Sequence, residues 1–149
     1  MDDVVRRARA LIGVRFRPQG RTVKAGLDCI GVVAMAFGLT AVRGDYALRS
    51  GNADVVNGEF ASSGFLPIPP AEAGAGDVLL VRTGFRQLHV VILTVDGYLH
   101  ADAALRRVVE VPGAVAWPVK GAWRHPDRSK DPHPARLRAT TPLPLAGEG

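Results

Sequence analysis

The chain has 149 residues, of which 47% are hydrophobic and 22% are charged, and its formal net charge is +5. These values are typical of one globular domain that is large enough to bury a hydrophobic core. The single cysteine excludes an internal disulfide framework, and no apolar run reaches the roughly 18 residues that a membrane span requires. The N-terminus lacks the pattern of a secretory signal, so we expect synthesis in the cytoplasm.

Positive charge gathers toward the two ends of the chain. Residues 1–25 contain seven Arg or Lys against two Asp, and residues 120–138 contain six basic residues against two acidic ones. Such ends suit an anionic cell wall or an acidic partner. The zinc-ligand spacing, helix-turn-helix pattern and interleaved aromatic residues that are typical of nucleic-acid binding are missing. We therefore interpret the charge as solvated surface and expect no nucleic-acid partner.

Helices are predicted in the first half of the chain and strands in the second. Apolar residues recur at helical spacing near the N-terminus and again after Asp28, a preferred N-cap residue, whereas strand patterns begin after Gly76. This order favours an α+β domain in which N-terminal helices pack on a central antiparallel sheet. The predicted helices cover residues 4–12 (ended by Gly13), 29–37 (closed by Gly38) and about 52–60; the predicted strands cover 77–82, 88–95, 97–102, 107–111 and either 115–117 or 121–124.

The remaining segments are predicted to be irregular. Residues 14–26 form a loop that leads to the second helix, and residues 40–75 form loops around the helix near 52–60. A long irregular connection in a small domain often forms the wall of a cleft. From residue 126 the chain turns polar and then proline-rich, without a core-forming period. We therefore divide the chain into a folded domain, 1–125, and a disordered tail, 126–149.

The lone cysteine, Cys29, lies at the predicted start of the second helix, directly after Asp28. A single cysteine is more often a small buried hydrophobic residue than a reactive group. At a helix start, however, unpaired backbone N–H groups and the helix dipole favour the thiolate, which is the nucleophilic form. We therefore predict that Cys29 is a nucleophile held in an environment that favours its thiolate.

A nucleophilic thiol needs a base within hydrogen-bond reach and a group that orients this base. His89 and His100 lie in neighbouring predicted strands, and a tight hairpin at Asp96-Gly97 places both on one face of the sheet. In that register the two side chains are roughly 13 Å apart at about 3.3 Å per residue, and Asp102 is nearer to His89. His89 is thus the candidate base, and its orienting partner is either His100 or Asp102. The other histidines, His125 and His133, are expected at the surface and in the tail.

Four stretches of sequence follow one another in a characteristic order. They are Asp28-Cys29-Ile30-Gly31, Gly76-Asp77-Val78-Leu79-Leu80, Leu88-His89-Val90-Val91-Ile92 and Leu99-His100-Ala101. In this order, and over residues 5–124, the chain resembles the NlpC-type cysteine peptidases, which are papain-like bacterial cell-wall hydrolases. The resemblance implies a papain-like α+β fold.

The resemblance also assigns roles to individual residues. It implies that Cys29 is the nucleophile, His89 the base, and His100 the third, polar member that orients His89. It further places Asp28 at the substrate cleft, beside the cysteine. Phe16 occupies a position where the family commonly has Tyr and which is associated with substrate contacts. No metal and no cofactor is implied, because acyl transfer by a thiol requires neither.

The implied function is hydrolysis of amide bonds in the peptide stems of peptidoglycan by a cysteine peptidase. The missing signal and the long middle segment look most like the phage and prophage tail branch of the family. This implies incorporation into a phage-like tail or baseplate, with the proteins of that particle as partners and no membrane insertion. Two alternatives stay open. One is a papain-like amidase or acyltransferase that acts on another substrate, and the other is a structural tail protein with a weakened site, which Ile30 and Phe16 support.

Overall fold

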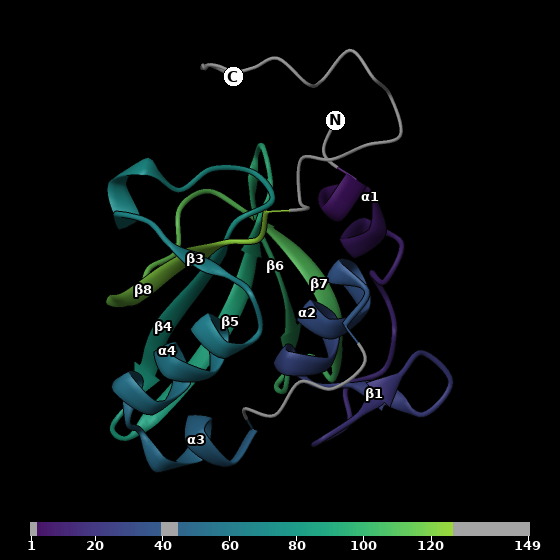
Figure 1. Ribbon diagram of the computed structural model, residues 1–149. Helices are drawn as coiled ribbons and strands as arrows, with labels where there is room; N and C mark the ends of the chain where they lie inside the picture. The colour runs from purple at the N-terminus through teal and green to yellow at the C-terminus, as the bar shows by residue number, and fades with distance from the viewer. Residues whose placement is uncertain (1–2, 40–44, 127–149) are drawn as a thin grey trace.

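The computed structural model describes residues 3–39 and 45–126, so all but the first residue of the predicted tail lies outside the described residues. In Figure 1 the helices lie against a six-stranded sheet in which every neighbouring pair of strands is antiparallel. This architecture confirms the predicted α+β class. Across the sheet the strands follow the order β3 (Leu66–Pro67), β8 (Val119–Arg124), β4 (Val78–Gly84), β5 (Gln87–Leu93), β6 (Gly97–Asp102) and β7 (Arg107–Pro112).

The helices of the described residues all precede β4 in the chain, as the sequence predicted. A separate small sheet lies before the second helix, within the segment that was predicted to be a loop. None of the helices in the described ranges is long and apolar enough to cross a membrane. The helices are α1 (Asp3–Arg9), α2 (Cys29–Phe37), α3 (Asp45–Ser50), α4 (Ala53–Ser62) and the 3-10 turn η1 (Pro70–Glu72), and the small sheet pairs β1 (Arg21–Thr22) with β2 (Gly26–Leu27).

Helix α2 has the predicted bounds, and both of its ends are capped as expected. The Asp28 carboxylate accepts a hydrogen bond of 2.8 Å from the Gly31 N–H, and Gly38 ends the helix in the left-handed conformation with φ 68°. Seven of its nine residues are buried. A helix that is apolar on nearly every side belongs in the interior, so its first residue, Cys29, is held at a fixed place in the core.

The first helix differs from the prediction at its C-terminal end. It stops at Arg9, and the chain continues in turns to Gly13, which has φ 92°. Ile12 is 47% exposed, so it does not extend the apolar face of the helix. The predicted helix is too long at this end because the sequence contains no helix breaker between Arg9 and Gly13.

The structure also differs in part from the prediction between residues 45 and 75 and in the last strand. The helix predicted near 52–60 is α4, which begins after the N-cap Asn52, whereas α3 and η1 were not predicted. Of the two candidate edge strands, 121–124 is correct, because it lies within β8, and 115–117 is not a strand.

The turn between β5 and β6 is centred one residue earlier than predicted, at Val95-Asp96 instead of Asp96-Gly97. Leu93 pairs with Tyr98, not with His100. The turn is closed by a hydrogen bond of 2.9 Å from the Thr94 N–H to the Gly97 carbonyl and by one of 3.0 Å from the Gly97 N–H to Thr94 Oγ1. The hydroxyl of Thr94 therefore stabilises a turn around Val95-Asp96, and the partner of each paired strand residue shifts by two positions.

The two faces of the sheet are covered differently. One face packs against α1, α2 and α4 and contains the larger hydrophobic core. The other face contains a smaller cluster that is covered by the connection between β7 and β8. Because three strands separate β7 from β8, this connection, which we call the crossover loop (residues 113–118), has to pass over the sheet. The smaller cluster consists of Leu79, Val81, Val91, Tyr98 and Ala122, with Val115 and Trp117 of the crossover loop packed against it.

Candidate active site

Cys29 begins helix α2 and points its sulfur at strand β5. The residue is 7% exposed, and its sulfur receives hydrogen bonds from the backbone of Val90 and of Ile30. Val90 directly follows His89 in β5. The start of α2 therefore places the thiol against the peptide that follows the candidate base.

Glycines let the preceding loop pack tightly against the first turn of α2. A Cβ atom at Gly31 would clash with the carbonyl oxygen of Gly20, and one at Gly20 would clash with the carbonyl oxygen of Gly26. Larger residues at these positions would force the loop away from the helix start. The loop and the nucleophile are thus fixed relative to each other by backbone contacts.

The Asp28 carboxylate is fully engaged within the protein. Besides capping α2, it accepts a hydrogen bond of 3.0 Å from the Gln19 N–H and one of 2.7 Å from Arg21 Nη1. Asp28 is buried, so the Arg21 guanidinium compensates a charge that would otherwise be costly to bury. The structure therefore gives Asp28 a role in shaping the loop and the helix start, and its predicted contact with substrate stays a prediction.

His89 and His100 meet directly, with 2.7 Å between His89 Nε2 and His100 Nδ1. The shifted register explains this contact. Ile92 pairs with Leu99, so His100 lies level with Val91, only two residues along β5 from His89. Diagonal neighbours of this kind lie about 7 to 8 Å apart at Cα, which two imidazole rings can bridge. The predicted separation was too large because it rested on a turn at Asp96-Gly97, one residue later than the observed turn.

Asp102 contacts the second histidine, not the first. Its Oδ2 atom lies 3.8 Å from His100 Nε2, and its Oδ1 atom accepts hydrogen bonds from the N–H groups of Ala104 and Leu105 at 2.8 and 3.0 Å. These turn contacts fix the carboxylate. The two candidates for orienting His89 are thus arranged in series: His100 touches His89, and Asp102 faces the far nitrogen of His100.

Two aromatic residues surround the histidine pair and were not recognised as part of the site from the sequence. The Trp117 ring lies 6.1 Å from the His89 ring and 5.9 Å from the His100 ring, and Tyr98 lies 5.4 Å from His100. Trp117 comes from the crossover loop, so its position depends on the strand order. The local sequence does not predict this position of Trp117, because residues 115–117 are equally compatible with a strand.

Burial determines the protonation state of the thiol. It raises the pKa of Cys29 to about 12, and the charge of Asp28 adds to this increase. The hydrogen bonds from Val90 and Ile30 and the charge of Arg21 act in the opposite direction. Burial and the charge of Asp28 therefore oppose the thiolate that the helix start was predicted to favour.

Burial also keeps the histidines neutral. Burial, together with the neighbouring His100, lowers the pKa of His89 to about 4, while Asp102 opposes the shift. The pKa of His100 is lowered by burial as well, again against Asp102. At neutral pH the resting site thus contains a neutral thiol and two neutral imidazoles.

The thiol and the base are neighbours without being hydrogen-bonded. Within the described residues, the Cys29 sulfur forms no hydrogen bond with His89, although it lies against the adjacent Val90 backbone. Catalytic hydrogen bonds are often long before substrate binds, so this geometry is compatible with a nucleophile and its base. In the same part of the chain, no group of three or more His, Cys, Asp or Glu side chains is arranged to hold a metal ion.

Phe16 and the remaining histidines lie at different distances from this centre. Phe16 is partly buried against the core, forms a parallel bridge with Leu27, and so lies beside the segment that leads into Cys29. His125 is partly buried, and its ring lies 4.9 Å from that of Phe65, so it is less exposed than the prediction of a surface residue suggested. His133 lies outside the described residues.

Comparisons with known proteins find similarity in solved structures only. No family model and no curated protein matches the chain. The peptidoglycan hydrolase RipB from Mycobacterium tuberculosis is 27% identical with a TM-score of 0.55, and the match covers 82% of this chain and 62% of the RipB chain. This chain thus spans less than two thirds of the solved RipB chain.

Two further structures share the fold at lower identity. The P60 domain of an antigen from M. avium subspecies paratuberculosis is 20% identical with a TM-score of 0.55, and the match covers 82% of this chain and 91% of that domain. A lipoprotein-like protein of the NLP/P60 family from Staphylococcus aureus is 18% identical with a TM-score of 0.54, covering 82% of this chain and 40% of that one. The chain therefore has the α+β, papain-like fold of NlpC/P60 domains.

Proposed function

We propose that this chain is a cysteine hydrolase that cleaves amide bonds in the peptide stems of peptidoglycan. The observation that carries the proposal is the 2.7 Å contact between His89 and His100, next to the Val90 backbone that binds the Cys29 sulfur. A nucleophile, a base and an orienting group are the parts that acyl transfer requires. The likeness to RipB, a peptidoglycan hydrolase that is 27% identical, supports the substrate class.

The histidine pair has one proton arrangement that leaves a base free for the thiol. A proton on His100 Nε2 faces the Asp102 carboxylate, which favours it electrostatically. His100 Nδ1 then accepts a hydrogen bond from His89 Nε2–H, and His89 Nδ1 has a free lone pair. In this arrangement His89 is a neutral base and takes up the thiol proton only as the sulfur attacks.

The reaction then follows in two halves. The Cys29 sulfur attacks the amide carbonyl carbon, its proton moves to His89, and the C–N bond breaks as His89 returns this proton to the leaving amine. Water next attacks the thioester while His89 accepts one of its protons. The C–S bond breaks, and the proton returns to the sulfur. The pair therefore needs no preformed thiolate, which agrees with the raised pKa of Cys29.

One backbone donor remains at the helix start for the oxyanion that forms during attack. The Gly31 N–H is bound by Asp28, and the Ile30 backbone is engaged by the sulfur. The Cys29 N–H is left to face the substrate carbonyl oxygen, where it is positioned by the same cap that fixes α2. An oxyanion donor of this kind typically contributes about 3 to 4 kcal/mol to transition-state stabilisation.

The substitution Cys29→Ala tests the proposal. We expect it to lower hydrolysis of purified sacculi by about 10⁴-fold or more, because the nucleophile is removed, with a change in unfolding free energy of only about 1 kcal/mol. Mass spectrometry of the products from defined muropeptides identifies the bond. Unchanged hydrolysis by the variant would contradict the nucleophile, and cleavage outside the stem peptide would favour the amidase or acyltransferase alternative.

A second candidate is a structural protein with a weakened site. It is favoured by the raised pKa of Cys29 and by the missing hydrogen bond between Cys29 and His89 in the described structure. The two candidates differ in whether His89 influences the thiol. If alkylation of Cys29 by iodoacetamide has the same rate in the wild type and in His89→Gln between pH 6 and 9, and sacculi are not degraded, the structural candidate is favoured.

The proposed role in a phage-like tail or baseplate rests on the sequence resemblance alone. It predicts that the full chain is incorporated into tail particles after synthesis in the cytoplasm and that it contacts other proteins of the particle. Mass spectrometry of purified particles from a strain that produces the protein provides the test. Absence of the chain from such particles, while it is abundant in the lysate, would contradict this role.

A further inference from the structure

Five exposed basic side chains gather beside the candidate active site. They come from three stretches of the chain: Arg15 and Arg17 precede β1, Lys24 lies between β1 and β2, and Arg106 and Arg107 lie at the start of β7. Segment 13–16 runs antiparallel along the free edge of β7, with hydrogen bonds of 2.9 Å from the Phe16 N–H to the Arg106 carbonyl and from the Val108 N–H to the Val14 carbonyl. We call the set the basic patch; it consists of Arg15, Arg17, Lys24, Arg106 and Arg107.

This strand pairing places positively charged side chains next to one another. Arg15 and Arg107 are direct antiparallel partners, so their Cβ atoms lie about 5 Å apart on the same face, an arrangement that is destabilising for like charges. Arg17 follows on the same face of segment 13–17, about 7 Å from Arg15 at roughly 3.3 Å per residue. Arg15 also reaches the Ala25 carbonyl at 3.1 Å, next to Lys24.

The patch lacks compensation from the protein itself. Over residues 3–39 and 45–126, the ion pairs of the structure involve none of its five side chains. The nearby carboxylates are engaged elsewhere: Asp28 with Arg21, and Glu110 with Arg9 at 2.9 Å. Asp102 is opposite Arg107 in the β6–β7 ladder, but its carboxylate faces the turn and His100. Since no carboxylate among the described residues forms an ion pair with the patch, we expect solvent or an external anion to relieve the repulsion.

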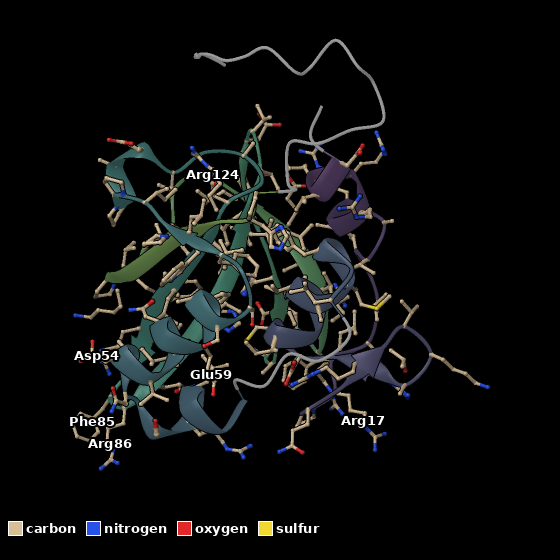
Figure 2. The ribbon with its side chains drawn as sticks, in the orientation of Figure 1. Arg17, Asp54, Glu59, Phe85, Arg86 and Arg124 are labelled. Atoms are coloured by element: carbon tan, nitrogen blue, oxygen red, sulfur yellow. The ribbon has the colours of Figure 1, made fainter. Side chains whose placement is uncertain are left out.

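The segments that carry the patch contact the segments that carry the candidate site. Phe16 bridges to Leu27, two residues before Cys29. The Arg106 N–H donates a hydrogen bond of 2.7 Å to the backbone carbonyl of Asp102, and the carboxylate of Asp102 faces His100. An anion bound on the patch is therefore held next to the substrate, on the side of the loop that precedes α2. In Figure 2, Arg17 lies beside β1, on the opposite side of the molecule from Arg86.

We propose that the basic patch binds a phosphodiester-bearing polymer attached to the cell wall and thereby holds the domain on its substrate. This rests on the proposed function for the location of the partner. Four of the five cations are arginines, whose guanidinium groups match phosphate oxygens in bidentate geometry. They are spread along a strand pair and do not converge on one point, which suits a chain with repeated single charges better than one small anion. Binding there raises the local concentration of stem peptides at Cys29.

Binding is measured with the full chain carrying Cys29→Ala, so that turnover does not enter the result. The probes are purified sacculi with covalently attached phosphodiester polymers, and the same sacculi after chemical removal of those polymers. The patch variant combines Arg15→Gln, Arg17→Gln and Arg107→Gln. The matched control combines Arg49→Gln, Arg86→Gln and Lys120→Gln, which removes the same charge from exposed residues outside the patch.

The proposal predicts that the patch variant binds polymer-bearing sacculi about 10- to 100-fold more weakly than the control at low salt, with a smaller salt dependence. Removing the polymer should abolish this difference. With Cys29 restored, patch variants should cleave soluble muropeptides normally and intact sacculi more slowly. Equal binding by patch and control variants, undiminished binding to stripped sacculi, or tighter binding to a DNA duplex than to polymer-bearing sacculi would each overturn it. Failure of hydrolysis by the wild type would leave the binding result standing and would contradict only the proposed activity.

Discussion

The two faces of the central sheet contribute different parts of the candidate site. The face that packs on the helices is the larger core, and it holds the thiol of Cys29 within that core. The face beneath the crossover loop has the smaller hydrophobic cluster, and it also holds His89 and His100 with Trp117 against them. Because of these two histidines we call it the polar face, and we call the other the apolar face. The larger hydrophobic core thus positions the nucleophile, whereas Trp117 packs against the base and its histidine partner.

The two contributions meet where the β5–β6 ladder is interrupted. Pairing between these strands is confined to two residue pairs next to the turn, and toward His89 the ladder does not continue. The start of α2 lies against this region, with the Cys29 sulfur bound to the Val90 backbone. An unbroken ladder would use the strand edges for pairing and would separate the thiol from the imidazoles. The broken ladder therefore serves to join the two faces.

After loss of the nucleophile itself, the largest effect is expected from removing the contact between His89 and His100 on the polar face. His100→Ala should lower kcat for muropeptide cleavage by about 10²- to 10⁴-fold, because His89 loses the partner that fixes its tautomer and ring orientation. The KM should change little, since His100 is buried and does not face the substrate. Steady-state kinetics on a soluble muropeptide provides the measurement.

A matched pair of variants separates orientation from packing. His100→Gln retains a polar group in the same space and should recover part of the lost activity, whereas His100→Phe fills the space without a hydrogen-bond acceptor and should not. Equal activity of the two variants would show that His100 acts by filling volume and would contradict a role in orienting His89.

The second effect concerns stability at acid pH and again arises on the polar face. The pKa of His89 is lowered from 6.5 to about 4 in the folded protein, so the folded state binds fewer protons than the unfolded state between these values. The contribution is fully present above pH 6.5 and is lost as the pH falls toward 4, by up to about 3 kcal/mol. Urea unfolding of the wild type at several pH values measures it.

The His89→Gln variant is the control for this pH dependence. Since glutamine does not titrate, the variant should lose less stability than the wild type between pH 7 and 4.5. The His100 ring shares the lowered pKa and Asp102 opposes both shifts, so some pH dependence should persist in the variant. Identical pH dependence of the two proteins would contradict burial of a neutral His89.

The apolar face was predictable from the sequence to a large extent. The bounds of α2 followed from the N-cap Asp28, the apolar run and the terminal Gly38, all of which are local signals. The main strands followed from their apolar patterns for the same reason. The α+β class was then fixed by the order of helices and strands, and the position of Cys29 followed from the helix start.

The polar face was less predictable because its geometry depends on long-range contacts. The Thr94 hydroxyl closes a turn around Val95-Asp96 instead of Asp96-Gly97, and the resulting shift of two residues in the strand pairing decides whether His100 reaches His89. Trp117 reaches the histidines only because β7 and β8 are three strands apart. The protonation of Cys29 likewise depends on how deeply α2 is buried, which the helix-start argument did not include.

The smallest effect is expected at the link between the loop and the apolar face. Asp28→Ala removes the cap of α2 and the partner of Arg21, and should destabilise the domain by about 1 to 2 kcal/mol in urea unfolding. Asp28→Asn keeps an acceptor for the Gly31 N–H and should cost about half as much. Because the Asp28 charge raises the pKa of the thiol, the Asn variant should also lower the pKa of Cys29, which the pH dependence of alkylation reports. A raised or unchanged thiol pKa in Asp28→Asn would show that the carboxylate acts on Cys29 only through the shape of the helix start, and that desolvation alone keeps the nucleophile protonated.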